Sequence, residues 1–169
     1  MPPFLFTIAG LPAHPLVVHA AVVLVPLVAV FHVATGWRRA WRQAYALPAA
    51  AIGIAGAVFA WLAKASGEPL EDSVKNAARA AGQQVRFGDH PEQGDAAFLW
   101  AVILGLGLAG FAVLAAIERK RALPGWAPMA AWAAAGVIGI IAIATMTIAG
   151  HSGAQLVWKD VGSFAAGRY

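Results

Sequence analysis

Four apolar runs, each long enough to cross a lipid bilayer, constrain this chain more than any other feature. They cover residues 15–33, 46–63, 96–117 and 127–149, and a helix needs about 20 residues to cross a hydrocarbon core of about 30 Å. The chain has 169 residues, of which 60% are hydrophobic and only 12% are charged. A soluble domain of this length cannot bury that much apolar surface. We therefore expect an all-α fold, an integral membrane four-helix bundle that forms a single transmembrane domain over residues 1–169.

A polar stretch, residues 66–95, separates the second and third apolar runs. It holds six of the eight acidic residues of the chain but only three basic ones. We expect this stretch to be a polar loop on the outer side of the membrane. Its middle, residues 70–81, is expected to form a short amphipathic helix at the interface.

Basic residues in the two short links between apolar runs orient the bundle. Short links that are rich in Lys and Arg face the cytoplasm. Both termini and the acidic loop are then expected on the non-cytoplasmic side. Tryptophans beside the links have the positions of interfacial anchors. The basic residues are Arg38, Arg39, Arg42, Arg119, Lys120 and Arg121, and the tryptophans are Trp37, Trp41 and Trp126.

The composition excludes several classes of function. The chain has no cysteine, which rules out disulfides, Cys-ligated zinc, iron–sulfur clusters and covalently attached c-type haem. The pI is about 10.0, but the positive charges lie beside apolar runs, so we expect a membrane protein that binds no nucleic acid. Nothing in the sequence indicates a substrate that the chain transforms. We therefore expect a binding or electron-transfer protein rather than an enzyme.

One glycine motif lies inside the third apolar run. Gly105, Gly107 and Gly110 match the G-x-G-x-x-G pattern of dinucleotide-binding proteins. That pattern binds a dinucleotide only when a strand precedes it and a helix follows it. Here the three glycines, like Gly53 in the second run, are expected to form a face for close helix packing.

Four of the five histidines fall at the outer ends of the apolar runs. His14 and His19 lie at the start of the first run, His90 precedes the third, and His151 follows the fourth. The fifth, His32, lies roughly 20 Å deeper than His19 at 1.5 Å per residue. An ionisable side chain within an apolar run indicates function, and His19 lies within one. We expect the four outer histidines to converge on one shared site.

Imidazole is a ligand of haem iron, copper and zinc. We expect His19 to be the principal ligand, with His90 and His151 as competing partners from other helices and His14 as a supporting or alternative ligand. Haem b held by two histidines needs no cysteine, and an apolar bundle excludes water from it. The expected function is that of a membrane cytochrome-like protein that binds haem b near the outer leaflet and transfers electrons. The cations expected near the haem propionates are Lys64, Arg79 and Arg86.

Other functions remain open at this point. Three or four of the histidines, with Asp89 or Glu92, could bind copper or zinc at the outer face, for metal handling or sensing. Histidines could also relay protons, because they titrate near neutral pH. A non-catalytic accessory subunit of a larger membrane complex would use its small-residue faces for docking. The expected partners are the lipid bilayer and other redox or respiratory membrane proteins.

The residues around these histidines resemble a known family. The first apolar run begins His14-Pro15-Leu16-Val17-Val18-His19, which resembles the HP-x-x-VH start of DUF2231, a bacterial family of small four-helix membrane proteins. Residues 65–68 (ASGE), His90 and residues 150–158 (GHSGAQLVW) resemble its other recurring segments, and their order agrees over roughly residues 11–162. The resemblance implies a multi-pass four-helix bundle in the bacterial plasma membrane. It assigns no chemistry.

Overall fold

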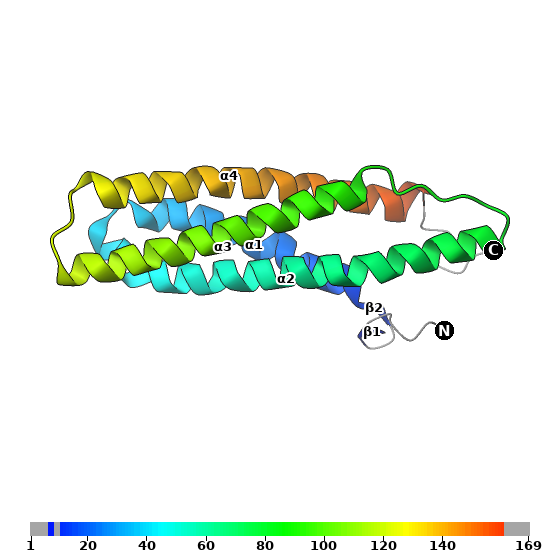
Figure 1. Ribbon diagram of the computed structural model, residues 1–169, viewed down its shortest axis with the longest axis horizontal. Coiled ribbons are helices and arrows are strands. Elements are labelled where there is room, and N and C mark those ends of the chain that lie inside the picture. Colours follow the sequence, from blue (N-terminus) through cyan, green and yellow to red (C-terminus); the bar gives the residue numbers. More distant parts are fainter. Residues whose placement is uncertain (1–6, 9–10, 161–169) are drawn as a thin grey trace.

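The structure, a computed structural model, describes residues 7–8 and 11–160 of the chain. Four long helices make up nearly all of it, and consecutive helices run antiparallel in one bundle (Figure 1). A pair of two-residue strands precedes the first helix. In chain order the elements are β1 (Thr7–Ile8), β2 (Leu11–Pro12), α1 (Ala13–Gly36), α2 (Arg39–Ala80), α3 (His90–Lys120), α4 (Trp126–Gln155) and a π-helical turn, η1 (Leu156–Asp160).

Each helix packs against two neighbours. Helix α1 packs along α2 and α4, and α3 packs along the same two helices, so that α1 and α3 lie diagonally across the bundle and meet only through side chains in its centre. The short links 37–38 and 121–125 lie together at one end, which we call the arginine end (Figure 1). The opposite end, which carries the starts of α1 and α3 and the connector 81–89, we call the histidine end.

The expected four-helix membrane fold is confirmed. All four helices are long and apolar enough to cross a membrane, yet only 28% to 39% of the residues in their most apolar windows are buried. Large apolar side chains such as Leu47, Leu106 and Ile140 point outward and are 62% to 73% exposed. An apolar exterior of this kind is stable in lipid and not in water. The direction in which the termini face stays a prediction.

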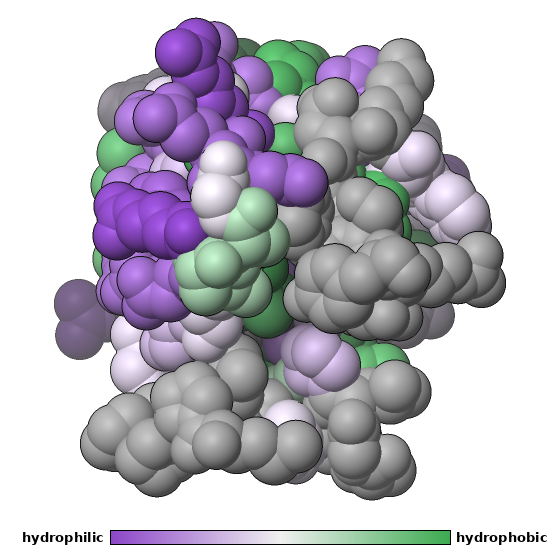
Figure 2. All heavy atoms as spheres, turned by 90° about the vertical axis from the view of Figure 1, so that its right-hand side faces the viewer, coloured by the Kyte–Doolittle hydropathy of each residue, from purple (hydrophilic) through white to green (hydrophobic). Residues whose placement is uncertain are grey.

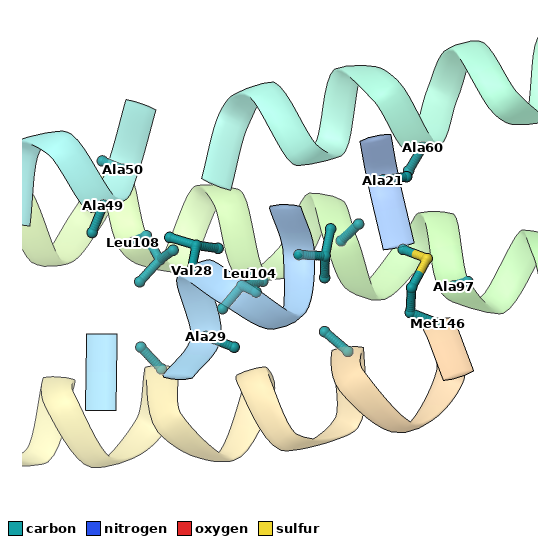
Figure 3. Packing of buried hydrophobic residues seen from close by; sticks show 14 of the residues in the cluster. Ala21, Val28, Ala29, Ala49, Ala50, Ala60, Ala97, Leu104, Leu108 and Met146 are labelled. Atoms are coloured by element: carbon teal, nitrogen blue, oxygen red, sulfur yellow. The ribbon is translucent and has the colours of Figure 1, made fainter. Parts of the chain in front are cut away.

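Small side chains let the helices approach closely. Leu104 and Leu108 of α3 pack beside Val28 of α1, among alanines of all four helices (Figure 3). A Cβ added to Gly105 would lie 3.1 Å from the carbonyl oxygen of Gly53, so α2 and α3 meet there almost backbone to backbone. The packing role expected of these two glycines is confirmed. It does not extend to Gly110, where an added Cβ would have no atom of another described helix within 4 Å.

Helix α2 is much longer than the second apolar run. Its 42 residues extend over about 63 Å, roughly twice the thickness of a hydrocarbon core. The structure thus differs from the expected polar loop 66–95 with a separate helix at 70–81, because residues 66–80 continue α2 without a break. Good helix formers and ion pairs four residues apart stabilise this extension. The pairs are Lys64–Glu68 and Glu71–Lys75.

Candidate cofactor site at the histidine end

Two of the four expected site residues, His14 and His90, are partly buried at the histidine end. His14 lies in the first turn of α1 and His90 begins α3, so the two rings come from diagonal helices. Figure 2 looks onto this end, where hydrophilic side chains of the described residues gather on one side. The site is thus placed where the apolar bundle meets a polar surface.

Helix α2 holds the His14 ring in place. The Nδ1–H of His14 donates a hydrogen bond to the carbonyl oxygen of Ala63 over 2.8 Å. The ring packs so closely against α2 that a Cβ on Gly67 would lie 3.0 Å from the His14 Cε1. A neutral imidazole that donates from Nδ1 keeps its lone pair on Nε2. Among the described residues, nothing hydrogen-bonds to that Nε2.

Helix α4 holds the His90 ring in a matching way. The Nδ1 of His90 lies 2.9 Å from the Ser152 hydroxyl oxygen, and that hydroxyl donates its own hydrogen to the Ala149 carbonyl over 3.1 Å. The hydroxyl therefore accepts from Nδ1–H, which again leaves the lone pair on Nε2. A Cβ on Gly153 would lie only 2.9 Å from the His90 Cε1, so a larger residue here would have to displace the ring.

His14 and His90 are held in place by the same kinds of contact. Each lies in the first turn of a helix and contacts the next helix along the chain. Each packs against a glycine of that helix and forms a hydrogen bond through Nδ1. Histidines that ligate metals are commonly anchored in this way, because a bond at one ring nitrogen orients the other toward the metal.

The structure does not bring His19 or His151 into this pair. Both are exposed. The Nδ1–H of His19 donates to the Pro15 carbonyl of its own helix, and the Nε2 of His151 accepts a 2.8 Å bond from the Gln155 amide, also within one helix. No hydrogen bond among the described residues joins either ring to His90.

The remaining expected residues are dispersed. Over residues 7–8 and 11–160, no three His, Asp or Glu side chains lie together as a metal-binding group. Asp89 and Glu92, expected as further metal ligands, are exposed, as are Arg79 and Arg86. Lys64 is paired with Asp95 over 2.5 Å. His14 and His90 are thus the two expected ligands that are partly buried at this end.

Such a donor set fits some metal centres and not others. Structural zinc sites take four protein ligands and catalytic zinc sites three. Haem b would need only one or two protein ligands, and histidine is a common one. Two anchored imidazoles on diagonal helices, each with an unshared Nε2 lone pair, have the chemistry that haem b requires.

An open hollow adjoins His90. It has a volume of about 820 Å³ and is lined by the connector before α3 and by the end of α4, including Ser152. Gln93, one turn after His90, also lines it, and its side-chain oxygen is buried without a hydrogen-bond partner among the described residues. Buried polar atoms of this kind are uncommon and point to a missing donor.

His32 lies apart from this site, as the sequence indicated. It is 1% exposed, and its Nε2–H donates to the Trp132 carbonyl over 3.2 Å. Its ring meets Phe111 edge to face, with 4.7 Å between the centroids. These contacts make His32 part of the core near the arginine end.

Sequence reasoning missed the residues that anchor the pair. Ala63, Gly67 and Ser152 carry no chemistry that a sequence pattern would single out. Two of them were within reach, because Gly67 and Ser152 lie in the segments 65–68 and 150–158 that carry the family resemblance. The structure shows why these segments go together: they hold His14 and His90.

Comparison with known proteins identifies a family of membrane proteins. A family model described as "Predicted membrane protein (DUF2231)" matches residues 10–165. No curated protein and no solved structure matches the chain. The match agrees with the four apolar helices and is silent on chemistry.

Proposed function

The chain belongs to the DUF2231 family of predicted membrane proteins, and from this premise we propose that it binds haem b through His14 and His90 and transfers electrons within the membrane. The proposal keeps the cofactor expected from the sequence. It replaces His19 by His14 as the principal ligand.

One observation carries the proposal: both rings are anchored through Nδ1 and keep Nε2 free of any described partner. Neither Nε2 is among the buried polar atoms of the described residues that lack a partner, so both lone pairs are accessible to a ligand. The matched arrangement on two diagonal helices supports a ligand held between them.

Each residue around the pair has a definite task in this proposal. The Ala63 carbonyl and the Ser152 hydroxyl fix the tautomer and the ring orientation of the two histidines. Gly67 and Gly153 leave room for the rings. The bundle excludes water from the apolar side of the site. A bound haem b would supply one-electron redox chemistry.

The test is a set of histidine variants, purified from membranes and measured by absorption spectroscopy in the oxidised and reduced states. His14→Ala and His90→Ala should each lose the spectrum of haem with two histidine ligands. His19→Ala and His151→Ala are the matched controls, because their rings are exposed and bound only within their own helices, and they should keep it.

Three results would contradict the proposal. If His19→Ala removes the spectrum and His14→Ala does not, the ligand is the one expected from the sequence. If all four variants keep the spectrum, the haem is bound elsewhere. If the wild type contains stoichiometric copper or zinc by elemental analysis and no haem, the site is a metal-ion site.

A further inference from the structure

The arginine end has a strong excess of positive charge. Six of the twelve basic residues of the chain lie there, in the two links and the adjoining helix ends, against one of the eight acidic residues, Glu118. The Glu118 carboxylate is neutralised by one of these basic residues, because both its oxygens accept hydrogen bonds from Arg42, over 2.8 Å and 2.5 Å. The other basic side chains of this end therefore face the surroundings with little compensation.

Arg38 has the most distinctive position among them. Its guanidinium carbon lies 5.1 Å from the ring centre of Trp37 and 5.0 Å from that of Trp41. It forms no ion pair with any residue that the structure describes. The indole rings and Arg38 border an open hollow of about 520 Å³, lined by residues 37–41.

Hydrogen bonds hold the backbone around this hollow in place. Arg42, which is buried, donates to the Trp37 carbonyl over 3.1 Å, and the Trp37 indole N–H donates to the Ala34 carbonyl over 3.1 Å. Arg39 donates to the Glu118 carbonyl over 3.2 Å and so ties the hollow to α3. The cationic group at residue 38 is therefore presented on a fixed frame, and little order has to be gained on binding.

The surroundings of the hollow indicate which anion it fits. Trp37 and Trp41 are 48% and 41% exposed, Tyr45 follows Trp41 one turn along α2 at 43%, and exposed apolar side chains such as Leu47, at 73%, come after it in the helix. A phosphate at Arg38 would thus be followed, along the membrane normal, by aromatic and then apolar surface. Headgroup, interface and acyl chains of a phospholipid have this order.

We propose that the hollow at residues 37–41 binds the headgroup phosphate of an anionic phospholipid, with Arg38 as its principal cation. The inference is independent of any cofactor at the histidine end. It makes the arginine end a site for a specific lipid class and not only a region of general positive charge.

Lipid binding to the detergent-solubilised protein tests this inference directly. Short-chain phosphatidylglycerol is titrated and bound lipid is counted by native mass spectrometry, with phosphatidylcholine and inorganic phosphate as separate arms. Arg38→Gln should weaken phosphatidylglycerol binding about five-fold, since a basic residue near an anionic lipid surface contributes about 1 kcal/mol. Arg79→Gln, an exposed arginine at the histidine end, is the matched control and should bind as the wild type does.

Phosphatidylcholine should bind weakly, and inorganic phosphate should not displace phosphatidylglycerol. Equal binding by Arg38→Gln and the wild type would overturn the proposal. So would equal binding of the two lipids, which would show that the acyl chains alone are recognised. Displacement by inorganic phosphate would show a general anion site instead.

Discussion

The buried ion pair between Arg42 and Glu118 gives the sharpest prediction about stability. It links α2 to α3 through two hydrogen bonds, and both side chains are only 9% exposed. Removing one partner of a buried pair costs about 3–5 kcal/mol, because the other charge is left without compensation. Arg42→Ala should lower the free energy of unfolding by about 3 kcal/mol, the lower end of this range. The reason is that Arg39 lies 3.6 Å from the remaining Glu118 carboxylate and partly compensates its charge.

Unfolding in mixed micelles with increasing SDS measures this cost as a change in the free energy of unfolding. Arg119→Ala, an exposed arginine one residue from Glu118, is the matched control and should be nearly neutral. The double variant Arg42→Met/Glu118→Leu should lose less stability than Arg42→Met and Glu118→Leu lose together. We expect an interaction free energy of about 2 kcal/mol between the two positions. If Arg42→Ala is as stable as Arg119→Ala, the pair does not join the helices in the membrane and the reasoning is refuted.

Three further changes test the packing. Gly105→Val should destabilise the bundle by about 1–3 kcal/mol in the same SDS titration, because overpacking forces the backbones of α2 and α3 apart. Gly110→Val is the control and should not destabilise it, because this position faces open space. Equal effects of the two changes would contradict close packing of α2 and α3. His32→Ala removes a side chain that is 1% exposed and should cost about 2–4 kcal/mol, so an unchanged unfolding midpoint would count against its role in the core. Gly153→Ala puts a methyl group 2.9 Å from the His90 ring and should alter the haem spectrum without unfolding the protein; a spectrum identical to that of the wild type would show that the ring position is not critical.

The fold was predictable because the solvent dictates it. A helix in lipid must satisfy its backbone hydrogen bonds internally and present apolar side chains to the acyl chains, and both requirements are visible as apolar runs. The length of α2 was not visible in this way. Hydropathy marks only the part of a helix that lies in lipid, while residues 66–80 extend it through helix propensity and ion pairs along its surface.

The choice between His14 and His19 was beyond the sequence for a geometric reason. Five residues correspond to a rotation of about 140° around a helix axis, so only one of the two rings can face the bundle. Position within the apolar run favoured His19. Packing decides which face of a helix points inward, and it turns His14 toward Ala63 of α2 and leaves His19 exposed.

The buried partner of Arg42 was missed because the charge pattern hides it. Arg42 and Glu118 belong to clusters that the positive-inside rule treats as solvated ends of helices. Only the structure shows that α2 begins at Arg39, several residues before the second apolar run, and thereby brings Arg42 against the end of α3. The distribution of charges along the sequence predicts how such helices are oriented, but it does not show which charged side chains form ion pairs.

The absorption spectrum of the wild-type protein, purified from membranes of cells with ample haem, tests the central proposal most directly. Binding through His14 and His90 predicts a strong Soret band, a sharpened visible band on reduction, and one haem for each intact pair. A folded, colourless protein that takes up no added haem would contradict it.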